Sequence, residues 1–167
     1  NEAIIWQKDI IDSNLNRLDW KYLSENSKVF SDLSMLGKYE NFIDWKGKEG
    51  VWRDSITENN GLPWNESFIE SVESKIDFNK LSASRCVKWS ERLIDTYIGR
   101  WNMKELACNE TVPWSLHLFE KYLDTSYFQH YPVKGNVALI SNINFIEKYQ
   151  NYLDWDSIFA NEQLPWF

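Results

Sequence analysis

A pattern that recurs about every 25 residues constrains this chain more than any other feature of its sequence. In Leu106–Tyr122 an anchoring leucine is followed by Asn109 and then by the run Val112–Ser115, which reads Val-Pro-Trp-Ser. The apolar pair Leu118-Phe119 and a final tyrosine close the pattern. Such a period is typical of repeat proteins, in which each copy buries its apolar face only against its neighbours.

The same offsets locate six copies, whose anchors are Leu23, Ile56, Leu81, Leu106, Val133 and Ile158. Successive anchors are separated by 33, 25, 25, 27 and 25 residues, so two insertions interrupt one shared period. Trp6, Ile10 and Ile11 match the second half of a further copy. We expect a single helical-repeat domain over residues 1–167, with partial repeats at both ends, and we expect it to be a segment of a longer array.

Each copy carries two helix-start signals, because short polar side chains that can cap exposed amide groups stand at two fixed offsets. The first set lies four residues before the anchor and comprises Asp19, Asp77, Asn102 and Asp154. The second set lies nine residues after the anchor and comprises Asp32, Asn65, Ser90, Ser115 and Asn142. Two helices per copy are therefore predicted.

The recurrent asparagine three residues after the anchor predicts where the first helix ends, since asparagine tolerates the left-handed conformation common there. Pro63, Pro113 and Pro165 then prevent that helix from continuing. We expect a first helix of about two turns and a second of two to three turns, which are too short to be stable alone. The predicted fold is all-α, an α-solenoid of stacked helix-turn-helix repeats that forms a right-handed superhelix.

The longer insertion, Asn41–Gly50, contains a competing helix start at Asp44-Trp45 and is expected to carry an extra turn. Insertions in repeat proteins fall in loops on one face, often the binding face. The alternative interpretation is a surface loop whose length has changed without any binding role.

The chemistry of the chain gives no catalytic, metal or cofactor site. A net charge of -7 argues against phosphate backbones and anionic membranes as partners. No apolar run reaches membrane-spanning length, and glycine-rich phosphate loops and nucleophile elbows are absent from the sequence. His117 and His130 have no ligands at metal-binding spacing, and Cys86 and Cys108 are interpreted as lone buried thiols. We therefore expect no enzymatic activity in these residues.

The recurrent tryptophan, asparagine and proline residues are interpreted as structural, because starting, stopping or packing a short helix accounts for each. Trp6, Trp20 and Trp155 are likewise expected to pack in the core or between copies. Charged residues that differ between copies, near the anchors and in the insertion, are the better candidates for binding a partner. They are Lys21, Glu25, Lys46, Lys48, Glu49, Asp54, Glu58, Lys80, Lys104, Glu105 and Asp156. A solvated face without a binding role is the alternative.

The motif in Leu106–Asn109, Val112–Ser115 and Leu118–Tyr122 resembles short tandem repeats rich in tryptophan, asparagine and proline from bacterial and large-DNA-virus proteins. The resemblance covers nearly the whole chain and implies a helical array. The resemblance implies no single established activity, and it identifies no catalytic residue in this chain. Val133–Tyr149 departs most from the motif, because it lacks both the proline and the tryptophan.

The leading hypothesis is a non-catalytic scaffold that binds a macromolecule, most plausibly a protein, along one face. One alternative is the repeat region of a larger enzyme or toxin whose catalytic part lies outside these residues. Nucleic-acid binding through exposed aromatic side chains is a further alternative, which the charge disfavours. Oligomeric state and compartment stay open, with the cytoplasm slightly favoured, since two cysteines form no disulfide framework.

Overall fold

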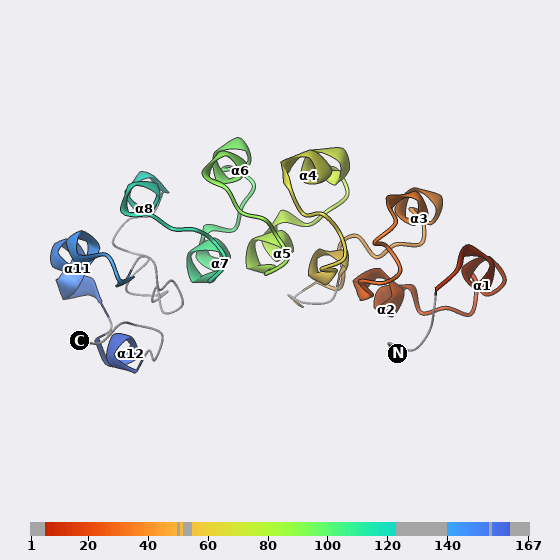
Figure 1. Cartoon of the computed structure of the whole chain (residues 1–167), viewed down its shortest axis with the longest axis horizontal. Coiled ribbons are helices and arrows are strands. Elements are labelled where there is room, and N and C mark those ends of the chain that lie inside the picture. The colour runs from red at the N-terminus through yellow and green to blue at the C-terminus, as the bar shows by residue number, and fades with distance from the viewer. Residues whose placement is uncertain (1–5, 50, 52–54, 123–139, 154, 161–167) are drawn as a thin grey trace. The chain divides into compact units, whose positions relative to one another are not determined.

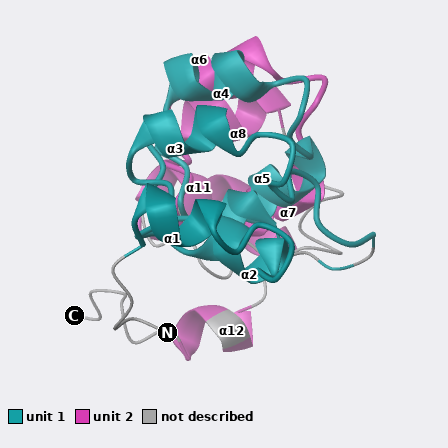
Figure 2. Cartoon of the chain, turned by 90° about the vertical axis from the view of Figure 1, so that its right-hand side faces the viewer, with its two compact units in different colours: residues 1–88 teal, residues 89–167 magenta. Residues whose placement is uncertain are grey.

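The computed structural model is all-helical over the residues that it describes, which are 6–49, 51, 55–122, 140–153 and 155–160. Figure 1 shows the helices α1 (Lys8–Asp12), α2 (Trp20–Glu25), α3 (Leu33–Lys38), η1 (Ile56–Glu58), α4 (Glu66–Val72), α5 (Phe78–Ala83), α6 (Glu91–Thr96), α7 (Met103–Cys108), α8 (Leu116–Tyr122), α11 (Ile143–Tyr149), η2 (Gln150–Tyr152) and α12 (Trp155–Phe159). No strand occurs in this part of the chain, so the all-α prediction is confirmed there. The chain divides into two compact units, residues 1–88 and 89–167, which Figure 2 colours separately.

Side-chain caps start the helices at the positions that the sequence predicts. The residues that accept a backbone N–H of the first helical turn are Asp19, Asp32, Asn65 and Asp77 in the first unit and Ser90, Asn102, Ser115 and Asn142 in the second. The remaining predicted cap, Asp154, lies outside the described residues. The caps satisfy amide groups that have no partner within the helix, which explains why such short helices begin at defined residues.

The prediction of left-handed asparagines at the ends of the first helices is wrong. Asn26, Asn59 and Asn109 have φ of -78°, -77° and -81° and ψ of 110°, 101° and 112°, which is extended backbone. The side-chain oxygen of each asparagine accepts the amide two residues later, a local bond that turns the chain out of the helix. Among the described residues only Gly47 has a positive φ, of 63°.

The helices are also shorter than expected. The α-helices contain five to seven residues each, which is less than two turns of 3.6 residues. The second helix of a copy therefore does not reach the two to three turns predicted for it. In the copy anchored at Ile56 the first helix is only the three-residue η1.

In the first unit, α1, α3 and α4 form one row and α2, η1 and α5 form another (Figure 1). The anchors Leu23, Ile56 and Leu81 are buried between them. Asn59, fully buried, donates through Nδ2 to the carbonyl oxygens of Ser24 at 2.8 Å and Asn26 at 3.1 Å. These bonds join the end of η1 to the end of α2, more than thirty residues earlier in the chain.

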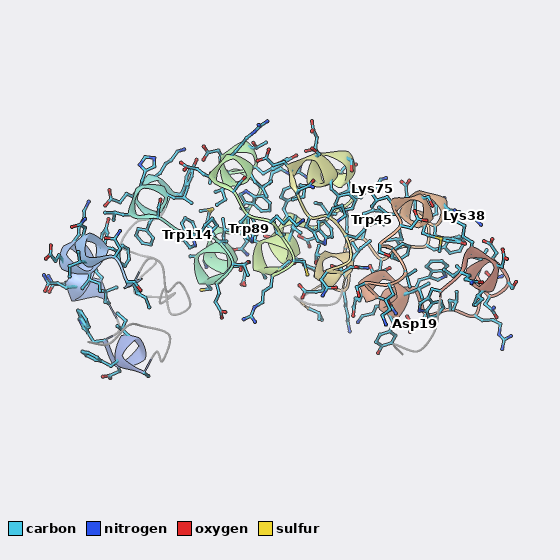
Figure 3. All side chains as sticks on the ribbon, viewed as in Figure 1. Asp19, Lys38, Trp45, Lys75, Trp89 and Trp114 are labelled. Carbon is cyan, nitrogen blue, oxygen red and sulfur yellow. The ribbon has the colours of Figure 1, made fainter. Side chains whose placement is uncertain are left out.

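In the second unit, aromatic side chains fill the space between the helices. Trp114 is buried, and its Nε1 donates to the Leu106 carbonyl oxygen at 3.2 Å, which ties the start of α8 to α7 (Figure 3). The rings of Phe119 and Phe145 meet edge to face, with centroids 5.2 Å apart, and join α8 to α11.

Most of the described tryptophans take part in this packing, as the structural interpretation expects. Their indole N–H groups donate to main-chain carbonyl oxygens at Trp20, Trp45, Trp64, Trp101, Trp114 and Trp155. Trp6 and Trp20 are half-buried. Trp155 is 37% exposed, so the expectation of a core position is wrong for that residue.

Candidate partner-binding surface

The charged residues singled out in the sequence differ in their exposure. Lys21, Lys46, Lys48, Glu49, Lys104 and Asp156 are exposed, whereas Glu25, Glu58 and Glu105 are half-buried. Lys80 is buried, and Asp54 lies outside the described residues. The exposed members lie on α2, α7 and α12 and in the segment between α3 and η1.

Lys80 does not belong to the exposed charges. Its side chain on α5 is only 4% exposed, and its ammonium donates to the Lys48 carbonyl oxygen at 2.8 Å. A buried ammonium needs hydrogen-bond partners to offset its lost hydration. Lys80 therefore fastens the insertion to α5, the first helix of the copy anchored at Leu81.

The backbone of Asp44 connects the insertion to two other segments of the first unit. The Asp44 amide donates to Ser24 Oγ at 2.9 Å, and the Asp44 carbonyl oxygen accepts the Ile56 amide at 3.2 Å. The Asp44 carboxylate accepts the amide of Gly47 at 2.7 Å. Residues 41–49 contain no helix, so the predicted extra turn is wrong, and Asp44 caps a loop in its place.

The indole of Trp45 anchors the same loop to the first unit. Its Nε1 donates to the Glu40 carbonyl oxygen at 3.0 Å, and the Lys75 ammonium lies 5.4 Å from the centre of its ring (Figure 3). Lys75 also pairs with the Glu40 carboxylate. The loop thus has a defined conformation in which the Lys46 and Lys48 side chains are exposed.

One offset combines exposure with chemical variety. Among the described residues, those two positions before the anchors are Lys21, Asn79, Lys104 and Asp156, and all four are exposed; Asp54 and Tyr131, at the same offset, lie outside the described residues. The residue after each of the first four anchors is small and buried: Ser24, Thr57, Ser82 and Ala107. The first helices thus present a variable side chain at one offset and a small buried one at another. We define the candidate surface separately in each unit: Lys21 and Asn79 with Lys46, Lys48 and Glu49 of the insertion in the first, and Lys104 and Asp156 in the second.

A second set of charges, on the other helix of each copy, was not found from the sequence. In each set an acidic residue accepts hydrogen bonds from a Lys-Tyr pair at the end of the next such helix. Asp95 and Glu120 lie fourteen positions after an anchor, and Asp12 holds the equivalent position in the partial copy that contains Trp6, Ile10 and Ile11. The three sets are Asp12 with Lys38 and Tyr39, Asp95 with Lys121 and Tyr122, and Glu120 with Lys148 and Tyr149. We call these sets the acid/Lys-Tyr contacts. The recurrence of Lys-Tyr at offsets fifteen and sixteen was the sequence signal for them.

The acid/Lys-Tyr contacts shift the titration of their members. The hydrogen bond from Lys38 lowers the pKa of Asp12, and that from Tyr122 lowers the pKa of Asp95. The hydrogen bond from Lys148 likewise lowers the pKa of Glu120. Because these are exposed carboxylates beside ammonium groups, the shifts indicate structural contacts and not an acid–base site.

The cysteine and histidine residues show no catalytic arrangement. Cys86 is half-buried and donates to the Glu58 carbonyl oxygen at 3.4 Å, whereas Cys108 is exposed, so the expectation of a buried thiol is wrong for Cys108. Desolvation raises the pKa of both thiols, which opposes formation of the nucleophilic thiolate. His117 is exposed as expected and lies 3.8 Å from Glu91, while His130 is outside the described residues. No group of three or more metal-binding side chains occurs within the described ranges.

None of the helices in the described part has both the length and the apolar character needed to cross a membrane. The chain matches no protein-family model, no curated protein and no solved structure in the comparisons made.

Proposed function

We propose that the chain is a non-catalytic α-solenoid of about six stacked helix-turn-helix copies that binds a protein partner through the candidate surface. The resemblance to tandem repeats rich in tryptophan, asparagine and proline is part of this proposal. A protein is the proposed partner because a net charge of -7 disfavours nucleic acids.

The observation that carries the proposal is that the recurrent residues make contacts within the chain, whereas the variable residues are exposed. The recurrent caps and the tryptophans Trp64 and Trp114 are engaged in hydrogen bonds within the chain, and the recurrent Trp89 packs edge to face on Trp101. The variable residues Lys21, Asn79, Lys104 and Asp156 occupy one equivalent exposed offset on the first helices α2, α5, α7 and α12. A constant scaffold with variable exposed positions is how repeat proteins generate partner specificity.

The insertion supports the same reading. Its bonds to Ser24, Ile56 and Lys80 hold it in one conformation before any partner arrives. A preorganised loop loses less conformational entropy on binding than a flexible one. Lys46 and Lys48 would therefore contribute more binding free energy here than on an unstructured loop.

The test is affinity capture with the immobilised chain from a lysate of the cells that express it, with mass spectrometry of the captured proteins. The chain is compared with the Lys21→Glu/Lys104→Glu variant, which reverses two charges of the candidate surface. We expect the specific partner to be lost by this variant, because reversed charges oppose the partner's complementary groups.

The matched control is Arg17→Glu/Lys88→Glu, which makes the same change in net charge at two exposed residues outside the candidate surface. This control is expected to retain the partner. Capture of no specific protein, or equal loss from both variants, would contradict the proposed function.

A further inference from the structure

In two pairs of neighbouring second helices, α1 with α3 and α6 with α8, the earlier helix contacts the later one through two positions one helical turn apart, which on α6 lie at offsets ten and fourteen from the anchor. On α1 these are Lys8, which donates to Ser34 Oγ at 3.1 Å, and Asp12, which pairs with Lys38. On α6 they are Glu91 and Asp95, which contact His117 and Lys121 of α8. Residues four apart share one face of a helix, so both positions point at the following helix.

On α11 the same two offsets are occupied by Ile143 and Glu147. Ile143 is 62% exposed, although its side chain is wholly apolar. Glu147 is exposed as well, and no described residue forms a hydrogen bond or ion pair with its carboxylate. The opposite side of α11 is already engaged, since Phe145 packs on Phe119 and Lys148 pairs with Glu120.

We propose that the Ile143/Glu147 face of α11 is a docking face for one more helix of the same kind, ending in a Lys-Tyr pair. The argument is continuity with the α8–α11 interface, in which Glu120 at offset fourteen accepts the hydrogen bonds of Lys148 and Tyr149. Glu147 is the next carboxylate in that series. Its charge selects a cation-bearing helix, and Ile143 supplies the apolar contact beside it.

Charge also argues against the simplest alternative occupant, a second copy of the chain that pairs through the same face. A two-fold interface on α11 would bring Glu147 close to its own counterpart. Two carboxylates in that position repel each other, whereas a lysine ammonium is attracted. This inference is independent of the partner-binding surface on the first helices.

The test supplies such a helix from this chain's own sequence. The sequence of Leu116–Tyr122, Leu-His-Leu-Phe-Glu-Lys-Tyr, is appended after Phe167, which places its lysine and tyrosine fifteen and sixteen residues after Ile158. Amide hydrogen exchange of Ile143–Tyr149 is then measured in the unextended and extended chains. We expect severalfold slower exchange across α11 and a higher Tm in the extended chain, because the docked helix removes the Ile143 face from solvent.

The control tail is Leu-His-Leu-Phe-Glu-Gln-Phe, which has the same length and a similar apolar content but neither the ammonium nor the hydroxyl. The protection is expected to require the Lys-Tyr tail and to fall when Glu147→Gln is introduced. Equal protection by both tails, absence of protection with the Lys-Tyr tail, or indifference to Glu147→Gln would overturn the proposal. Association of the unextended chain in sedimentation experiments, with Ile143 protected, would assign the face to a second copy and also overturn it.

Discussion

The ammonium of Lys121 lies 2.9 Å from Oδ2 of Asp95, although 26 residues separate them in the sequence. The pair joins α8 to α6, and the hydroxyl of Tyr122 donates to the same carboxylate. Asp12 with Lys38, also 26 residues apart, repeats the arrangement between α1 and α3. Exposed ion pairs are screened and flexible, so we expect these contacts to define the register between helices more than the total stability.

The first prediction concerns the stability of the chain in acid. Because the acid/Lys-Tyr contacts lower the pKa of Asp12, Asp95 and Glu120, the unfolded chain binds protons at these carboxylates more readily than the folded chain. The stabilisation that these contacts give the folded state is therefore fully present at pH values above the ordinary pKa values of 3.8 and 4.5. It is lost as the pH falls through the lowered pKa values. Thermal unfolding from pH 7 to pH 2 should show a shallower loss of Tm below about pH 4 in Asp12→Asn/Asp95→Asn/Glu120→Gln than in the unaltered chain. Identical slopes would show that these contacts do not form in solution.

An acid–lysine pair like those in the acid/Lys-Tyr contacts, without the tyrosine, can be built between α3 and α4, where Gly37 lies at offset fourteen and Ser71 at offset fifteen of the next copy. A side chain at Gly37 meets no atom within 4 Å of its Cβ, and Ser71 is exposed. We expect Gly37→Asp and Ser71→Lys to show a favourable coupling of about 0.2–1 kcal/mol in a double-mutant cycle of denaturant unfolding. The neutral control Gly37→Asn with Ser71→Lys should show none, and equal coupling in both cycles would refute the ion pair.

Two glycines should respond to alanine in opposite directions. Gly37 is helical with open space around it, so Gly37→Ala should stabilise the chain by about 0.5–1 kcal/mol. At Gly61 a Cβ would lie 2.1 Å from the Ser27 carbonyl oxygen and 2.8 Å from the Ser27 carbonyl carbon. Both are backbone atoms, which cannot move away as a flexible side chain could. Gly61→Ala should therefore cost about 1–3 kcal/mol or more in the free energy of unfolding. Urea unfolding of Gly37→Ala and Gly61→Ala measures both changes in the free energy of unfolding. No change in Gly61→Ala would contradict the close approach of Gly61 to Ser27.

Asn59 is predicted to be the most sensitive polar residue of the first unit. Asn59→Asp keeps the shape of the side chain but removes the two donations to the carbonyl oxygens of Ser24 and Asn26. We expect a loss of about 1–3 kcal/mol, because buried carbonyl groups are left without their donor. The control is Asn60→Asp at the exposed neighbouring residue, which should change the free energy of unfolding by less than about 0.5 kcal/mol. Similar effects of the two substitutions on urea unfolding would contradict this role.

Lys80→Met tests whether Lys80 holds the insertion in place. The substitution preserves much of the apolar stem but removes the donation to the Lys48 carbonyl oxygen. Amide exchange in residues 44–49 should become faster, while exchange in α4 changes little, because the contact is local to the loop and α5. Unchanged exchange in the insertion would show that Asp44 and Trp45 suffice to hold it.

Much of the local structure could be predicted because it depends on residues only a few positions apart. The caps at Asp32, Asn65 and Ser90 bond to amides two or three residues later, so their spacing is visible in the sequence. The helix-ending asparagines were located correctly but given the wrong conformation. Each of them accepts the amide two residues later in extended backbone, and Asn59 also donates to the preceding copy, a bond that its local sequence does not reveal.

The exposure of the charged candidate residues likewise could not be predicted from the local sequence. Lys80 and Lys104 lie at neighbouring offsets from their anchors, and the sequence treats them as alike. One is buried and the other exposed, because the insertion lies against α5 and offers Lys80 a carbonyl oxygen. The acid/Lys-Tyr contacts could have been found from their offsets, since acidic residue and Lys-Tyr recur with the period of the pattern.

By itself, the sequence determined the period, the two helix starts in each copy and the all-helical character of the described part, since caps and turn residues act over a few positions. Only the tertiary structure decided which asparagine is buried, which lysine is exposed and which carboxylate meets which Lys-Tyr pair. These outcomes depend on atoms some 26 to 35 residues apart in the chain, as in the pair Asp95 and Lys121 and in the bond from Asn59 to Ser24. Burial and long-range hydrogen bonding are set when the copies pack, and helices of five to seven residues acquire their stability only at that step.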